Sequence, residues 1–143
     1  MSPKMTKAEL TAFMTREFPQ VADDFVIDDL RAMHLTLRLR VAERHLRPGG
    51  TVSGLAIFAL ADVGMYLAVL SMIGPQALAV TTNCSLDFMR KPVAGADLIA
   101  DVRLLKLGRV LAVGDVLVRS DGAEAPAARA NLTYSIPPSE VER

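Results

Sequence analysis

The first third of the chain shows a helical pattern followed by a strand pattern. Thr6 to Glu9 form a capping box, and apolar residues then recur at helical spacing, which predicts a short helix over residues 5–19 that ends at Pro19. After an Asp-rich polar stretch, apolar and polar residues alternate over residues 35–42. This alternation is typical of a strand with one face toward water.

A long apolar segment predicts a buried helix. Nearly every residue from 54 to 73 is apolar, Ser53 or Thr51 stands where a helix cap is needed, and Gly74 follows the segment. A helix that is apolar on all sides must be covered. In a chain of this length, only a curved sheet is large enough to cover it.

The rest of the chain predicts four strands joined in sequence order. They cover about residues 80–88, 100–104, 110–118 and 128–136, with tight turns at Gly108–Arg109 and Asp121–Gly122. We therefore expect an α+β fold in which an antiparallel meander wraps one long central helix. Residues 1–143 would form a single domain, with 137–143 as a C-terminal tail.

Composition and charge exclude several classes of protein. The 143 residues carry 16 Lys and Arg against 16 Asp and Glu, a balance that argues against nucleic-acid binding. A single cysteine, Cys84, and a charged N-terminal segment lead us to expect a cytoplasmic protein without a signal peptide. Residues 55–73 resemble a membrane span, but Asp62 near their centre would cost about 2.5–3.5 kcal/mol there, so we expect no membrane association.

Asp62 is the only charged residue between Arg47 and Asp87, and it lies in the middle of the predicted core helix. A carboxylate in such a place must be hydrogen-bonded, paired with a cation or protonated. Two interpretations stay open. Asp62 is either a structural residue satisfied by a neighbouring polar group or a catalytic carboxylate in a cleft.

Gly54 lies in the first turn of the same helix, where free N–H groups and the helix dipole can polarise a carbonyl oxygen. It is separated from Asp62 by ~12 Å along the helix and ~80° around it, so one acyl carbon cannot contact both. If both residues act, Gly54 of one subunit must meet Asp62 of another, which predicts a homodimer or a dimer of dimers. Otherwise Gly54 only permits close packing at the start of the helix.

The stretch from Gly50 to Asp62 contains a Gly-containing loop, the start of the long helix and the sequence Leu-x-Asp. Together with residues 85–92 and 105–109, this order of motifs resembles the PaaI-type acyl-CoA thioesterases of the hotdog superfamily. The resemblance covers roughly residues 35–136 and implies a hotdog fold. It implies hydrolysis of a fatty or aryl acyl-CoA to a free acid and coenzyme A, with no cofactor beyond the coenzyme A of the substrate.

The resemblance also implies roles for individual residues. Asp62 would be the general base or nucleophile, and Gly54 would donate its N–H to the thioester oxygen. A hydroxyl from Thr81 or Thr82 would assist, and simple alternation points Thr82 toward the helix, although both can be ordinary strand threonines. Further candidates for contact with coenzyme A or the acyl group are Arg90, Lys91, Gly108, Arg109, Phe58, Met65 and Tyr66, the last three of which can equally be core residues.

Some positions depart from the family pattern. Ser53 replaces the usual catalytic His, Arg47 replaces the usual Asn, and Leu55 replaces a second Gly. These changes favour an alternative function, acyl-CoA binding without hydrolysis, and Arg47 could contact Asp62, an acidic acyl group or only solvent. We expect no metal site, because the two histidines have no ligand cluster around them, and we expect Cys84 to be a core residue.

Overall fold

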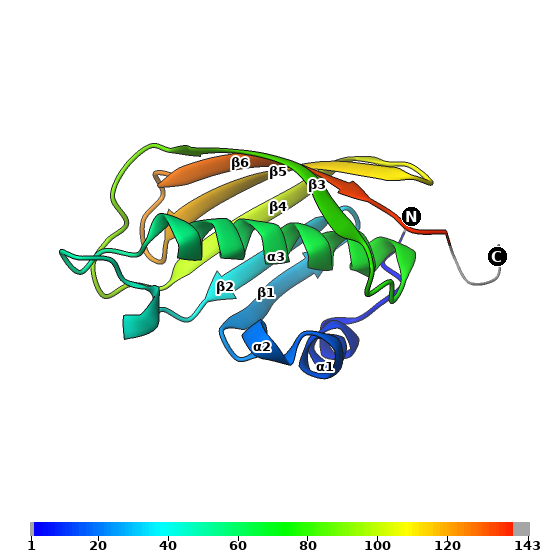
Figure 1. Cartoon of the computed structure of the whole chain (residues 1–143), viewed down its shortest axis with the longest axis horizontal. Coiled ribbons are helices and arrows are strands. Elements are labelled where there is room, and N and C mark those ends of the chain that lie inside the picture. The colour runs from blue at the N-terminus through cyan, green and yellow to red at the C-terminus, as the bar shows by residue number, and fades with distance from the viewer. Residues whose placement is uncertain (1, 139–143) are drawn as a thin grey trace.

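Helix α3 (Gly54–Ile73) crosses the concave side of a curved antiparallel sheet (Figure 1). This computed structural model describes residues 2–138. The remaining elements are α1 (Lys7–Glu17), α2 (Pro19–Ala22), β1 (Phe25–Arg31), β2 (His34–Leu39), the 3-10 turn η1 (Glu43–His45), β3 (Val80–Phe88), β4 (Leu98–Leu107), β5 (Leu111–Ser120) and β6 (Ala128–Ser135). The predicted α+β fold, a sheet wrapped around one long helix, is confirmed.

The strand order differs from the predicted meander. The sheet runs β1-β2-β4-β5-β6-β3, so β3 pairs with β6 at one edge and has no contact with β4 in the ladder. The prediction was wrong because it assumed that strands adjacent in sequence are adjacent in space. The segment between β3 and β4 instead passes the start of α3 and leads to β4 in the middle of the sheet (Figure 1).

Strand β1 was missed in the sequence. Its alternation is broken by a β-bulge between Ile27 and Asp29, which turns a half-buried edge strand into an apparently polar stretch. By contrast, β2 was predicted, because Leu35, Leu37 and Leu39 are buried at every second position.

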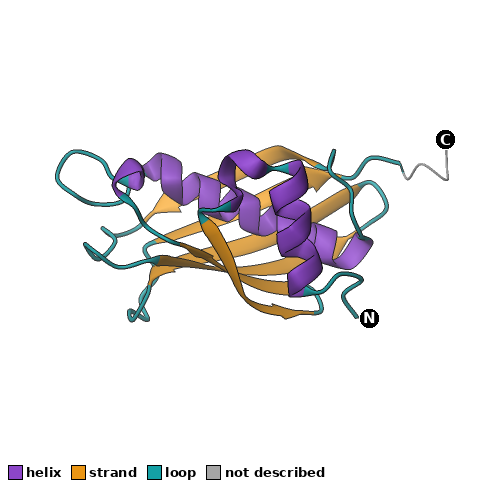
Figure 2. Ribbon diagram, turned by 90° about the horizontal axis from the view of Figure 1, so that it is seen from below, coloured by secondary structure: helices purple, strands orange, loops and turns teal. Residues whose placement is uncertain are grey.

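The N-terminal helix α1 begins at the predicted capping box and ends at Glu17, just before Pro19, as the sequence predicted. Thr6 and Glu9 form the capping box. Pro19 then begins the separate short helix α2, which the sequence did not predict, because a missing N–H costs nothing at the first position of a helix. Figure 2 shows the short helices on the same side of the sheet as α3.

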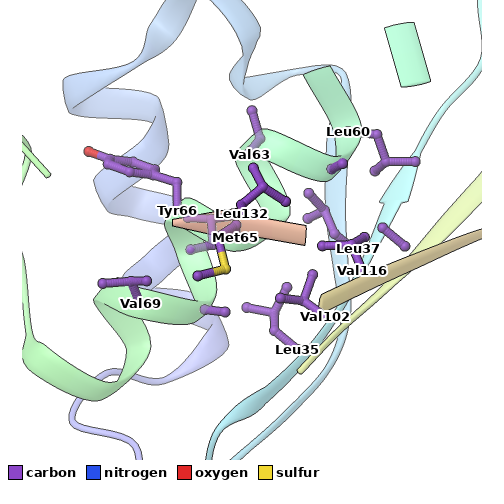
Figure 3. Packing of buried hydrophobic residues seen from close by; sticks show 14 of the residues in the cluster. Leu35, Leu37, Leu60, Val63, Met65, Tyr66, Val69, Val102, Val116 and Leu132 are labelled. Atoms are coloured by element: carbon purple, nitrogen blue, oxygen red, sulfur yellow. The ribbon is translucent and has the colours of Figure 1, made fainter. Parts of the chain in front are cut away.

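Helix α3 has the limits that the sequence predicted. Ser53, rather than Thr51, caps it by accepting a hydrogen bond from the Ala56 N–H at 3.1 Å, and Gly74 ends it with a φ of 96°. Its length and hydropathy would suit a membrane span, but 78% of its most apolar window is buried within the protein. Met65 of α3 packs with side chains of the sheet, including Leu37 and Val102, to form the core (Figure 3).

Candidate active site

Asp62 projects from the middle of α3 and is half-buried. Its Oδ1 atom accepts hydrogen bonds from the Thr81 hydroxyl at 2.5 Å and from the Tyr134 hydroxyl at 2.8 Å. The long helix therefore presents a carboxylate to the start of β3 and the end of β6.

A β-bulge decides which threonine reaches Asp62. The register of β3 and β6 shifts between Thr81 and Asn83, so the alternation that would turn Thr82 inward is reversed at this point. Thr81 faces the helix, whereas Thr82 is exposed and donates a hydrogen bond to the Thr133 carbonyl at 3.3 Å. The expected inward orientation of Thr82 is therefore wrong.

Tyr134 is a member of this cluster that the sequence did not single out. It lies directly opposite Thr81 in the β3–β6 ladder and is only 2% exposed. Burial, together with the negative charge of Asp62, raises the pKa of its phenol far above the ordinary value, so the hydroxyl keeps its proton and remains a donor. The one available signal was its place in the inward alternation of Ala128, Ala130 and Leu132.

The second oxygen of Asp62 faces open space. Within residues 2–138 no hydrogen bond reaches Oδ2, yet no buried side-chain oxygen or nitrogen in these residues lacks a partner. Oδ2 must therefore be accessible to solvent. Asp62 lines a cleft of about 380 Å³, whose other lining residues are Glu17, Phe18, Val63, Tyr66, Ala77, Ala79, Val80, Thr81 and Tyr134.

The three candidates for the acyl pocket lie in different surroundings. Tyr66 lines the cleft, and its hydroxyl donates a hydrogen bond to the Ala77 carbonyl at 3.0 Å. Met65 was expected beside it, but Met65 is fully buried and faces β5, because neighbouring residues on a helix point about 100° apart. Phe58 is 39% exposed and lies outside the lining of this cleft.

Gly54 lies at the other end of β3. A Cβ atom placed on Gly54 would stand 3.2 Å from the ring of Phe88, the last residue of that strand. In the described residues, no acceptor bonds the Gly54 N–H, which is the first N–H of the helix. Leu55 beside it is 84% exposed, and Arg47 lies exposed in the preceding loop.

One protomer therefore carries two separate half-sites. Asp62 with Thr81 marks the start of β3, and Gly54 with Phe88 marks its end. Of the possibilities open for Arg47, a contact with Asp62 is absent from the hydrogen bonds and ion pairs of residues 2–138, since Arg47 lies exposed at the Gly54 end. Ser53 uses its hydroxyl as the helix cap.

The basic candidates also divide between the two ends. Arg90 and Lys91 follow β3 near the Gly54 end, and Arg90 donates to the Pro126 carbonyl at 2.6 Å. Gly108 and Arg109 line a wide cleft of about 990 Å³ near the C-terminal end of α3, together with Lys4.

Cys84 points toward the helix side of β3 and is half-buried. Burial, and secondarily the charge of Asp62, raises the pKa of its thiol, which makes it a poor nucleophile. No group of three or more His, Cys, Asp or Glu side chains suited to a metal ion occurs within residues 2–138.

Comparison with known proteins identifies the family. The thioesterase superfamily model matches residues 49–127, more than half of the chain. A crystal structure from Silicibacter sp. TM1040, described as a candidate thioesterase, is 59% identical with a TM-score of 0.90 and covers 96% of each chain.

Two further relatives support the same family. A candidate esterase of Pseudomonas aeruginosa is 32% identical over 72% of this chain and 75% of its own length. The phenylacetic acid degradation protein PaaI of Thermus thermophilus, solved as a mutant, is 28% identical with a TM-score of 0.72, covering 83% of this chain and 99% of its own. The chain, with its central helix, its wrapping sheet and its match to these proteins, belongs to the thioesterase superfamily of hotdog proteins.

Proposed function

We propose that the protein hydrolyses acyl-CoA thioesters at sites shared between two copies of the chain. The observation that carries this proposal is the arrangement along β3, where a carboxylate with one open oxygen lies at one end and a free helix N–H lies at the other. These are the two groups that thioester hydrolysis needs, a base and an oxyanion donor.

Pairing of β3 with its own copy would bring the two groups together. β3 is an edge strand, so one side of its backbone is open to a partner. In an antiparallel pair centred near Cys84, the start of each strand lies beside the end of the other. The partner's Gly54, under its own Phe88, would then lie beside Asp62 and Thr81.

Exposed apolar side chains support this interface. Leu55, Val80 and Phe88 are 84%, 54% and 58% exposed in the single chain, and all three lie at the ends of β3 or at the start of α3. Apolar side chains beside an open strand edge are typical of a surface that another chain covers.

The chemistry follows from these positions. Asp62 Oδ2 takes a proton from water as the water oxygen attacks the thioester carbon, and the partner's Gly54 N–H stabilises the negative charge on the carbonyl oxygen. The C–S bond then breaks, and the coenzyme A thiolate receives the proton from Asp62. Direct attack by Asp62 through an anhydride that water hydrolyses would use the same two groups.

The same dimer would gather the basic residues around one substrate. Arg109 lies at the Asp62 end of one chain, and Arg90 and Lys91 lie at the Gly54 end, so antiparallel pairing would bring them together as binding groups for phosphates. A protein of the same fold from Streptococcus mutans, 24% identical with a TM-score of 0.70, was solved bound to acetyl-CoA.

The direct test measures thiol release from a panel of acyl-CoA substrates. We expect Asp62→Asn to stay folded and lose at least about a hundredfold in kcat, the scale of general base catalysis. Asp115→Asn is the matched control, because Asp115 is exposed on the outer face of β5. Equal rates for Asp62→Asn and the wild type would contradict the assignment.

A mixing experiment tests the sharing of the site. Gly54→Pro removes the proposed donor, and proline suits this first helical position because Ser53 already has an extended ψ of 155°. Gly54→Ala keeps the N–H but adds the same Cβ beside Phe88, which separates crowding from loss of the donor. Randomly reassembled Asp62→Asn and Gly54→Pro chains should recover about a quarter of wild-type activity, because half of the dimers contain one intact site. No recovery would contradict a shared site.

Acyl-CoA binding without turnover is the second candidate. Ser53 stands where the family usually has His; its hydroxyl accepts the Ala56 N–H as the helix cap, and a hydroxyl, unlike an imidazole, does not take a proton from water near neutral pH. Tight acyl-CoA binding with no thiol release would support this function instead.

A further inference from the structure

We infer that Tyr134 is a positioning residue that fixes Asp62 so that Oδ2 alone is the reacting oxygen. This inference rests on the proposed function and concerns a residue that is almost fully buried at the edge of the cleft. The geometry behind it lies in three side chains that meet from α3, β3 and β6.

Two donors hold the same oxygen of Asp62. The Tyr134 hydroxyl lies 2.8 Å from Oδ1 and the Thr81 hydroxyl lies 2.5 Å from it. The Tyr134 oxygen is also 3.1 Å from the backbone carbonyl of Asp62, so the phenol contacts both the side chain and the helix that carries it. A carboxylate held at one oxygen by two donors cannot rotate freely to exchange its oxygens.

Tyr134 acts only through Asp62. The side chain is 2% exposed and lies between α3 and the sheet, with the Tyr66 ring 6.2 Å away, centre to centre. Its hydroxyl is bonded to Asp62, and the raised pKa means that it does not transfer a proton near neutral pH. Thr81 and Tyr134 both border the cleft, but Thr81 is the more exposed of the two and can contact a water molecule as well as Asp62.

The ladder explains why these groups meet. Thr81 and Tyr134 are directly opposite partners in β3 and β6, and the bulge after Thr81 turns its hydroxyl inward beside the phenol. A one-residue change of register would remove Thr81 and leave Tyr134 as the only donor to the carboxylate.

Kinetics of Tyr134→Phe provide the main test. We expect kcat to fall about tenfold while KM stays within about twofold of the wild type, because a badly oriented base slows the chemistry without changing substrate contacts. Ser71→Ala is the control, since Ser71 is a fully buried hydroxyl of the same helix that bonds the Ala68 carbonyl. A kcat for Tyr134→Phe within twofold of the wild type, or an equal loss in Ser71→Ala, would overturn the inference.

Thr81→Val provides a second test, which does not depend on whether Tyr134→Phe folds. This variant leaves Tyr134 as the only donor to Oδ1, so we expect it to keep more activity than Asp62→Asn. In Thr81→Val/Tyr134→Phe the loss should exceed the product of the two single losses, because each single variant retains one donor. Activity of Thr81→Val as low as that of Asp62→Asn would contradict a role for Tyr134.

A titration of tyrosine absorbance tests the contact without any turnover. In a Tyr66→Phe background Tyr134 is the only tyrosine, and Asp62→Asn removes the charge that opposes its ionisation. The ionisation should then begin about half a pH unit lower or more. An unchanged pH at which ionisation begins would show that Tyr134 and Asp62 are not coupled. Absence of thiol release from every acyl-CoA would reject the proposed function, but the titration would still test the contact between Tyr134 and Asp62.

Discussion

The two sides of helix α3 have different surroundings. Toward the sheet, Met65 and Gly64 pack against β5 and β4 so closely that a Cβ on Gly114 would lie 2.7 Å from the Met65 sulfur, and one on Gly64 would lie 2.9 Å from Val102. Toward the cleft, the same helix presents Asp62 and Tyr66, whose polar atoms bond three other segments. One side therefore fixes the fold, and the other holds the residues of the proposed chemistry.

This difference predicts that stability and activity can be changed separately. Substitutions on the sheet side should lower stability and leave the activity of the folded protein unchanged. Substitutions on the cleft side should lower the activity and leave the stability nearly unchanged.

The largest stability effect is expected at Gly114. Gly114→Val places a Cβ 2.7 Å from the Met65 sulfur and 3.0 Å from the Arg103 carbonyl, which cannot move without disturbing the β4–β5 ladder. We expect the free energy of unfolding, measured in urea, to fall by about 2–3 kcal/mol. Leu117→Ala on the outer face of β5 is the control, since Leu117 is 50% exposed and should matter much less. Equal losses for both variants would mean that the sheet side is not closely packed.

The sequence predicted the sheet side of α3 better than the cleft side. Ser53, Gly74 and an unbroken apolar run determine the helix, and regular alternation determines β2, because each depends on neighbours in the chain. The Asp62 cluster depends on a bulge at Thr82 and on Tyr134, which is 72 residues away from Asp62. No local pattern contains that register, so alternation alone selected the wrong threonine.

The tyrosines of the cleft side should make stability sensitive to alkali. Burial, together with the charges of Asp62 and Glu17 respectively, raises the pKa of Tyr134 and Tyr66 above the ordinary 10.0. Above pH 10 the unfolded phenols ionise while the folded ones stay neutral, so stability is full below pH 10 and falls as the pH rises further. For Tyr134 the loss should reach about 1.4 kcal/mol at pH 11.

Urea unfolding between pH 8 and 11 measures this loss. Tyr134→Phe should show a smaller decrease than the wild type, because one ionising group is gone. The same decrease in both proteins would contradict the burial of the Tyr134 phenol.

Cys84 can report on the charge of Asp62 from the neighbouring strand. Burial and then Asp62 raise the pKa of its thiol, so Asp62→Asn should lower that pKa and increase the rate of thiol alkylation at pH 8 by about two- to fivefold. Asp87→Asn removes a charge from the outer face of β3, where it pairs with Arg129 at 2.9 Å, and should leave the rate unchanged. Equal alkylation rates for the wild type and Asp62→Asn would contradict an effect of the Asp62 charge on the Cys84 thiol.

The smallest expected effect concerns the choice of acyl group. Glu17 and Asp62 both line the cleft, and none of its lining residues is basic, so an acyl group that ends in a carboxylate meets repulsion. We expect pentanoyl-CoA to be preferred over glutaryl-CoA, which has the same number of acyl carbons. Glu17→Gln should narrow the ratio of the two kcat/KM values by about threefold, a modest change because Glu17 is 43% exposed.

Asp23→Asn is the matched control, since Asp23 is an exposed acid that lies close in the chain but outside the cleft. An equal change in both variants would mean that overall charge, rather than the cleft, sets the preference. A ratio unaffected by Glu17→Gln would place the acyl group away from Glu17. The ratio thus tests whether the acyl group enters the cleft beside Glu17.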